Sequence, residues 1–168
     1  MTPSGVDDKD LALLPEKVDG KFLLYHRIAS RICADLLSEI KDGTPISRCI
    51  EIMGPREGMW DAAKVGIAGP PLKVPGGYLM LYHGVSHRKR YRVGAVLLGE
   101  TGMQVVARSA DPVFEPVAEY ELSGEIPNVV FPCGAVIRGD TLYMYYGGAD
   151  TVVGVATAKL SRILSALT

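Results

Sequence analysis

The sequence lacks the features that mark several broad classes of protein. Its formal net charge is only −1 at pH 7, so it has no basic surplus to attract nucleic acid or an anionic membrane. Its apolar runs are far shorter than the roughly 20 residues of a membrane span. The N-terminal stretch MTPSGVDDKD is polar and acidic, without the basic and apolar regions of a secretory signal. We therefore expect a cytoplasmic protein with neither a nucleic-acid nor a membrane partner.

Cysteine is also scarce. Cys33, Cys49 and Cys133 are odd in number and widely spaced, and no two of them form a CxxC pair. This pattern suggests neither a zinc site nor a disulfide framework. The sequence predicts three reduced and mostly buried thiols, as is usual in the cytoplasm.

What the sequence does contain is a threefold internal repeat. Its copies read GKFLLYHR, GYLMLYHG and GDTLYMYYGG, and their tyrosines are 57 and 64 residues apart, at Tyr25, Tyr82 and Tyr146. A second strand-like run follows each copy: RICADL, YRVGAVLL and TVVGVATAKL. Repeats of this length with strands inside them are typical of β-propeller blades. Because a propeller needs four to eight blades, we expect part of a ring. We expect Tyr82, Tyr145 and Tyr146 to pack between blades rather than to stack on a sugar.

The spacing of the apolar residues predicts an all-β fold. No stretch has the amphipathic pattern of a helix longer than two turns, and Gly and Pro punctuate many short strand signals. We predict loops over 1–10 and 54–71, and strands over 22–26, 32–36, 46–53, 78–83, 91–98, 104–108, 129–131, 134–137, 142–146 and 152–158. For the tail at 160–167 two interpretations stay open, a last strand or a short helical cap.

Polar side chains close the three repeats. Arg27, His83 and Asp150 occupy nearly equivalent positions, and equivalent positions of different blades face one central channel. We therefore expect these side chains to share one site. A guanidinium offers a fork of donors to phosphate or carboxylate, and a neighbouring anion favours the imidazolium form of histidine. The structural alternatives are an ion pair for Arg27 and a core histidine bonded to the backbone for His83.

Six motifs carry a resemblance to a known family: DKDLALLPEKVDGKFLLYHRI, WDAAKVGIAGPPL, GGYLMLYHGV, YRVGAVLL, YELSGEIPNVVFPCG and YYGGADTVVGVATAKL. In this order they resemble the C-terminal half of glycoside hydrolase family 130, the β-mannoside phosphorylases and their relatives, which are five-bladed β-propellers. The resemblance runs from Asp7 to about Leu160. It implies a single domain over 1–168, an incomplete propeller of about three blades, each a four-stranded antiparallel sheet.

The resemblance also implies roles for individual residues. Arg27 of the HR pair and His83 of the YHG motif would bind inorganic phosphate. Lys64 of the KVG motif and Asp150 of the YYGGAD motif would contact the sugars. Phosphate would be a co-substrate, with no cofactor and no metal. The structural alternatives are a solvated loop lysine for Lys64 and a turn residue for Asp150.

The family's general acid is an aspartate in the N-terminal half, which no part of this sequence matches. No catalytic residue is therefore assigned, and Asp10 and Asp61 are the only carboxylates we nominate as substitutes. The expected function is phosphorolysis of β-mannosides (manno-oligosaccharides) to mannose 1-phosphate. A non-catalytic carbohydrate-binding fragment is the alternative, and the presence of Arg27 and His83 argues against a hydrolase.

An open stack of blades exposes faces and strand edges that a full ring would bury. The expected partners, besides a β-mannoside oligosaccharide and phosphate, are therefore further copies of the chain, as a homo-oligomer, or the missing N-terminal half.

Overall fold

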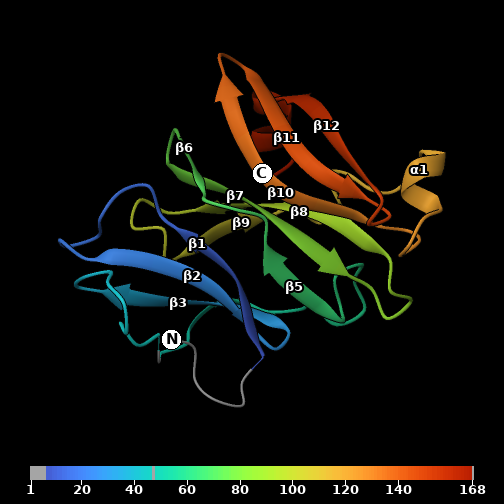
Figure 1. Cartoon of the computed structure of the whole chain (residues 1–168). Helices are drawn as coiled ribbons and strands as arrows, with labels where there is room; N and C mark the ends of the chain where they lie inside the picture. Colours follow the sequence, from blue (N-terminus) through green and yellow to red (C-terminus); the bar gives the residue numbers. More distant parts are fainter. Residues whose placement is uncertain (1–6, 47, 168) are drawn as a thin grey trace.

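The computed structural model describes residues 7–46 and 48–167, and within them the chain folds into antiparallel β-sheets with two short helices (Figure 1). The first sheet has the order β1-β2-β3-β4. Its strands are β1 (Asp8–Leu13), β2 (Phe22–Ile28), β3 (Arg31–Leu37) and β4 (Ile50–Met53).

The second sheet is the central one. Its strands follow the order β5-β7-β8-β9, and β6 also pairs with β7. They are β5 (Lys64–Ile67), β6 (Leu72–Val74), β7 (Gly77–Val85), β8 (Tyr91–Leu98) and β9 (Val105–Arg108). The third sheet consists of β10 (Val130–Arg138), β11 (Thr141–Gly148) and β12 (Val152–Lys159), and the helices are α1 (Glu119–Leu122) and α2 (Leu160–Ser165).

The all-β prediction is confirmed, but several boundaries differ. The described sheets have four, five and three strands, so the expectation of four-stranded sheets is correct for the first sheet alone. β5 lies inside the predicted loop over 54–71, because a four-residue strand among glycines and prolines carries little periodicity. β1 begins within the predicted loop over 1–10, whose residues 1–6 lie outside the described part. β4 is shorter than the predicted 46–53, of which Ser47 is not described. Of the two interpretations left open for the tail, a last strand or a helical cap, the structure has the helical cap, α2.

β10 runs through Pro132, where the sequence predicted a break. Pro132 pairs with Tyr146, and the register shifts between Pro132 and Gly134. β10 is an edge strand of its sheet. Proline is tolerated there because no ladder hydrogen bond is lost on the free side, and a bulge absorbs the irregularity.

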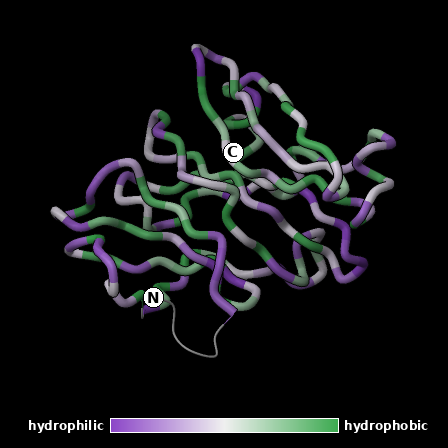
Figure 2. The backbone as a smooth tube through the Cα atoms, in the orientation of Figure 1, coloured by the Kyte–Doolittle hydropathy of each residue, from purple (hydrophilic) through white to green (hydrophobic). Residues whose placement is uncertain are grey.

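The hydrophobic core lies on both faces of the second sheet. β7 is buried at all nine positions, so it reads as a continuous apolar run rather than an alternating one. Met80 and Tyr82 belong to the core shared with the first sheet. Leu79 and Leu81 belong to the core shared with the third sheet. Figure 2 shows apolar stretches gathered along the central strands, with hydrophilic hairpin tips around them.

Tyr82 and Tyr146 are packing residues, as predicted, but the prediction is wrong for Tyr145, which is 46% exposed because it lies on the outer face of β11. Tyr25, Tyr82 and Tyr146 are at most 4% exposed. The Tyr82 and Tyr146 hydroxyls donate to Asp61 and Glu121 at 2.9 and 2.7 Å, and the Tyr25 hydroxyl donates to the Gly102 carbonyl at 2.7 Å. Two of the rings lie over cross-strand glycines: a Cβ on Gly94 or Gly154 would come within 2.3 or 2.8 Å of the facing ring. Such aromatic–glycine pairs restore the packing that glycine lacks.

The prediction of three reduced, mostly buried thiols is wrong. Cys33 and Cys49 form a disulfide with their Cα atoms 4.9 Å apart, and Cys133 is free and exposed. Cys33 lies on β3 and Cys49 directly before β4, which pairs with β3. The fold therefore brings together two thiols whose 16-residue separation gives no pairing signal. The expected cytoplasmic location stays a prediction.

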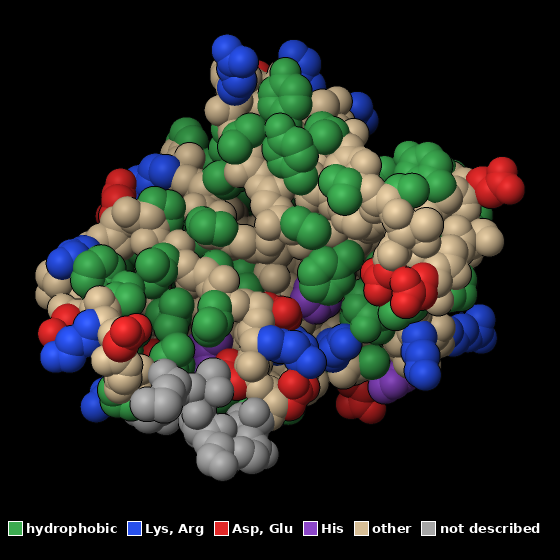
Figure 3. Space-filling view, in the orientation of Figure 1, with side chains coloured by type: hydrophobic (Ala, Val, Ile, Leu, Met, Phe, Trp, Pro, Cys, Tyr) green, Lys and Arg blue, Asp and Glu red, His purple; other side chains and the backbone are tan. Residues whose placement is uncertain are grey.

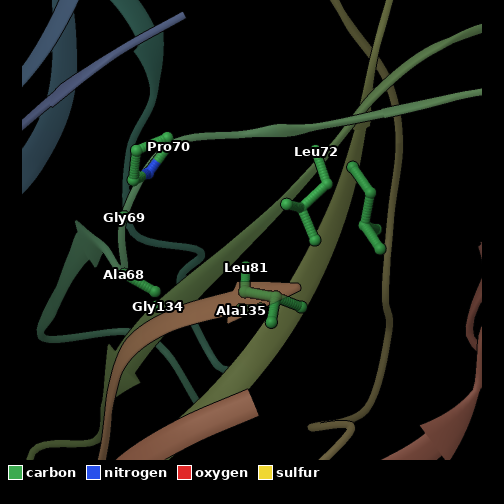
Figure 4. A pocket seen from close by; sticks show the side chains of 8 residues that line it. Ala68, Gly69, Pro70, Leu72, Leu81, Gly134 and Ala135 are labelled. Carbon is green, nitrogen blue, oxygen red and sulfur yellow. The ribbon is translucent and has the colours of Figure 1, made fainter. Parts of the chain in front are cut away.

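The outer face of the third sheet is apolar and exposed. Val136, Tyr145, Val153 and Val155 are 46–85% exposed, and hydrophobic side chains cover this part of the surface in Figure 3. A separate small cavity of about 10 Å³ lies between β7 and β10 (Figure 4). Its lining is apolar, so it offers no group for a phosphate or a sugar. In the described part of the chain, the helices are all too short to cross a membrane.

Candidate anion-binding site

Arg27 and His83 meet at one carboxylate. Arg27 lies on β2 and His83 on β7, and Asp10 on β1 lies between them. The Arg27 Nε donates to Asp10 Oδ2 at 2.7 Å, and His83 Nε2 lies 3.8 Å from the same oxygen. Arg27 is 4% exposed and His83 1%. The expectation that these two side chains lie close together is confirmed, while their role as phosphate ligands stays a prediction.

The backbone of β1 bends to bring Asp10 to this position. The register of β1 against β2 shifts between Lys9 and Ala12, which marks a bulge. Asp10 itself has φ of 59°, in the left-handed region that few residues other than glycine adopt. Aspartate tolerates this region better than most residues, yet the conformation still costs about 1–3 kcal/mol. Such strain is found mainly where a side chain must be aimed at a particular place.

A glycine on β5 makes room for the contact between the two sheets. Gly66 pairs with His83. A Cβ on Gly66 would lie 2.4 Å from Asp10 Oδ2 and 2.3 Å from His83 Cε1. The side chain of any other residue would therefore separate the carboxylate of the first sheet from the histidine of the second.

Lys64 lies beside this cluster rather than on a solvated loop. It opens β5 two residues before Gly66, so the two residues share a face of the strand. Its Nζ donates to the Tyr91 hydroxyl at 2.8 Å. The Tyr91 ring lies 6.1 Å from the His83 ring, and the Phe131 ring lies 4.5 Å from it.

Phe131 belongs to β10, so all three sheets contribute side chains to this site. Figure 3 shows basic, acidic and histidine side chains adjoining near the centre of the face that it displays. Sequence reasoning did not place Tyr91 or Phe131 here. The two rings stand in quoted motifs, but nothing local indicates which ring will cover the imidazole.

The imidazole of His83 is neutral at neutral pH when its surroundings are the protein's own groups. Burial is the main cause that lowers the pKa of His83 to about 4; the positive charges of Arg27 and Lys64 act in the same direction, and the charge of Asp10 opposes them. One anion is too few to offset the loss of hydration around a buried cation. His83 can therefore offer an anion one N–H donor but no positive charge of its own.

Two nitrogen atoms of the cluster have no hydrogen-bond partner among the described residues. Arg27 Nη1 donates to the Ala29 carbonyl at 2.5 Å and lies 3.8 Å from an Asp7 oxygen. Among the described residues, no hydrogen bond engages Arg27 Nη2. The buried Nδ1 of His83 likewise lacks a partner among them. Buried polar atoms are nearly always paired in native proteins, so the buried Nδ1 of His83 indicates a place for a ligand or a water.

Asp150 does not join the cluster. It is an exposed turn residue after β11 with φ of 53°. Within 7–46 and 48–167, no hydrogen bond or ion pair connects it to Arg27, His83 or Lys64. Its position matches the structural alternative, and its role as a sugar contact stays a prediction.

The repeat positions are also less equivalent than expected. The strict counterpart of His83 is His26, whose ring nitrogens face an Asp8 oxygen at 3.0 Å and the Arg48 carbonyl at 3.1 Å. Neighbouring residues on a strand face opposite sides, so the one-residue offset between His26 and Arg27 selects a different face.

Asp61 forms a structural ion-pair centre. Its side chain is fully buried, and Oδ2 accepts hydrogen bonds from Arg56 at 2.8 Å, Arg108 at 2.6 Å and Tyr82 at 2.9 Å. Burial alone would raise the pKa of Asp61, but the Arg56 hydrogen bond and the Arg108 charge outweigh burial and leave that pKa below its usual value. A carboxylate with a lowered pKa holds no proton at neutral pH, which makes Asp61 a poor general acid.

Comparison with known proteins places the chain in a family. The family model described as beta-1,4-mannooligosaccharide phosphorylase matches residues 4–168. The chain belongs to glycoside hydrolase family 130. Among its relatives, a 1,2-beta-oligomannan phosphorylase of Thermoanaerobacter sp. (strain X514) is 42% identical over 160 residues, which are 93% of this chain and 52% of that protein. A beta-1,4-mannooligosaccharide phosphorylase of Ruminococcus albus is 30% identical over 162 residues, which are 90% of this chain and 48% of that protein.

A solved structure agrees with these sequence matches. The complex of beta-1,2-mannobiose phosphorylase from Listeria innocua with beta-1,2-mannobiose superposes with a TM-score of 0.88 at 38% identity. The superposition covers 96% of this family 130 chain and 47% of the Listeria chain. The chain thus spans about half the length of the relatives that it matches.

Proposed function

We propose that this chain is the phosphate-binding part of a β-mannoside phosphorylase that releases mannose 1-phosphate. The observation that carries this proposal is the meeting of Arg27 and His83 at a nearly buried site. There the buried Nδ1 of His83 lacks a partner, and no hydrogen bond among the described residues engages Arg27 Nη2. The relatives support it, because they are named as phosphorylases of mannosides. We also propose that the chain is one domain and that its three sheets belong to an incomplete five-bladed propeller.

The proposed reaction needs few protein groups. Phosphate is itself the nucleophile: one of its oxygens bonds to the anomeric carbon as the glycosidic C–O bond breaks, and the leaving oxygen takes a proton from an acid. Arg27 would supply a charged N–H donor through Nη2, and His83 would supply a neutral donor. Lys64 would add a positive charge nearby and contact the sugar. Holding phosphate beneath the anomeric carbon supplies much of the rate gain.

The general acid would come from outside this chain. Asp61 is held ionised by two arginines, and Asp10 Oδ2 is engaged by Arg27. Because the relatives are about twice as long, we propose that a second polypeptide part supplies the acid and completes the sugar site. No cofactor or metal enters this reaction, in which phosphate is the co-substrate.

A second candidate is a carbohydrate-binding fragment without catalysis. The observation that favours it is the same half-length coverage, since a chain without a general acid keeps a sugar surface but no turnover. The two candidates differ in one measurable property, the formation of mannose 1-phosphate.

Phosphate binding and phosphorolysis together test the proposal. Calorimetry with inorganic phosphate should show binding that Arg27→Ala or His83→Ala abolishes. The matched control is Arg31→Ala, because Arg31 is an exposed arginine paired with Glu51 on the same sheet. Failure of the wild-type chain to bind phosphate would refute the proposal.

Turnover is then followed by ³¹P NMR with β-1,2-mannobiose, the linkage named for the relatives of higher identity, and with β-1,4-mannobiose. Mannose 1-phosphate formed by this chain, alone or with the complementary half of a relative, supports the phosphorylase. Sugar binding without product under both conditions supports the fragment.

A further inference from the structure

We propose that Asp10 is the positioning residue of the anion site: it holds Arg27 by Nε and leaves Nη2 directed at the ligand. This inference rests on the proposed function, because the ligand is taken to be phosphate. Asp10 itself would touch neither the phosphate nor the sugar. Its contribution would be to keep one orientation of the guanidinium before the ligand arrives.

The contacts of Arg27 support this role. Its Nε donates to the Asp10 carboxylate at 2.7 Å, and its Nη1 donates to the Ala29 carbonyl at 2.5 Å. A planar guanidinium anchored at two of its three nitrogens cannot rotate about its own axis. The third nitrogen, Nη2, then points in a fixed direction and is available for a charge-assisted bond to an anion.

Two features of the backbone make the hydrogen bond between Asp10 and Arg27 possible. Asp10 is held at φ of 59° beside a bulge, and Gly66 leaves open the space that the Asp10 carboxylate crosses. A surface aspartate paired with an arginine by chance needs neither feature. Strain at one residue and an enforced glycine at another, both serving one hydrogen bond, are typical of a site built for function.

Asp10 could instead act through its negative charge, and this alternative role can be tested. The groups that face His83 are Asp10 from β1, Arg27 from β2, Lys64 from β5 and Tyr91 from β8. Asp10 is the anion among them, and its negative charge would repel phosphate. If Asp10 acted through its charge, neutralising it would strengthen phosphate binding; if it acts by position, only loss of its oxygen atoms matters.

Three variants of the full chain separate these roles. Asp10→Asn keeps an oxygen that accepts from Arg27 Nε and should leave phosphate affinity within about threefold of wild type. Asp10→Ala removes the anchor and should weaken binding by about tenfold or more. Asp7→Ala is the matched control: Asp7 is 59% exposed at its side chain, lies 3.8 Å from Arg27 Nη1, and should have little effect.

A second readout needs no phosphate. In ¹⁵N-labelled protein the Arg27 Nε–H should exchange slowly with water in wild type and Asp10→Asn, and rapidly in Asp10→Ala. Rapid exchange in wild type would overturn the inference even if phosphate binds. Equal losses of phosphate affinity in Asp10→Asn and Asp10→Ala, or no loss in either, would also overturn it. If wild type binds no phosphate while its Nε–H is protected, the proposed function fails and the anchor itself stands.

Discussion

Replacement of Gly66 by alanine should damage both the stability of the protein and its anion site. The added Cβ would lie 2.3 Å from His83 Cε1 and 2.4 Å from Asp10 Oδ2. Neither neighbour can move away easily. His83 is 1% exposed with the Phe131 ring 4.5 Å from its own, and Asp10 is bonded to Arg27.

The magnitude follows from two opposing effects. Overpacking a well-packed site costs about 1–3 kcal/mol. Replacing glycine by alanine returns about 0.4–1 kcal/mol, because the unfolded chain loses freedom. We expect a net loss of about 1–2 kcal/mol, which for a protein of this size lowers Tm by roughly 2–8 °C.

The assay is urea unfolding followed by the fluorescence of Trp60, which is the single tryptophan and stacks on Tyr82 at 5.7 Å. The control is Gly134→Ala, because Gly134 also lies in a strand but a Cβ there would meet nothing within 4 Å. Phosphate affinity should fall in Gly66→Ala and stay unchanged in Gly134→Ala. Equal stability and equal phosphate affinity in the two variants would refute the assignment of Gly66 as the space for the Asp10–His83 contact.

Three further predictions concern the rest of the molecule. Asp61→Asn leaves two partly buried arginines without their counterion and should cost about 3–5 kcal/mol in urea unfolding, whereas Glu115→Gln, at an exposed ion pair, should cost under about 1 kcal/mol. The folded-state pKa of His83 is about 4 against 6.5 when unfolded, so the unfolded state binds the proton first as pH falls. Stability should therefore drop between pH 6.5 and 4, by up to about 3 kcal/mol, and His83→Gln should lose that share of the pH dependence; identical pH profiles would contradict it. The exposed third-sheet face should cause self-association that the double variant Val153→Lys/Val155→Lys abolishes, and a wild-type monomer at high concentration in sedimentation would count against it.

Local sequence patterns were enough for most of the strands. β7 and β8 were predicted almost to their ends, because an apolar run bounded by glycines or turn residues is a local signal. β5 was missed because KVGI has only four residues and contains a glycine. That glycine, Gly66, is explained by a neighbour from another sheet, which no local pattern reveals.

The site was predictable in part. The repeat and the motifs selected Arg27, His83 and Lys64, and all three lie in one cluster. Asp10 was nominated only as a substitute acid, and its contact with both Arg27 and His83 depends on a bulge in β1. The low pKa of His83 could not be predicted from the sequence, because it depends on burial of the imidazole, and the rings packed near it come from β8 and β10.

The amino-acid order alone therefore determined the all-β character, the threefold repeat and the family, since periodicity and motifs are properties of neighbouring residues. Tertiary structure decided that a carboxylate from β1 bridges an arginine and a neutral histidine, and that Cys33 meets Cys49. These outcomes depend on contacts between segments 16 to 73 residues apart and on the burial that those contacts create. Their energies arise only when the sheets pack together.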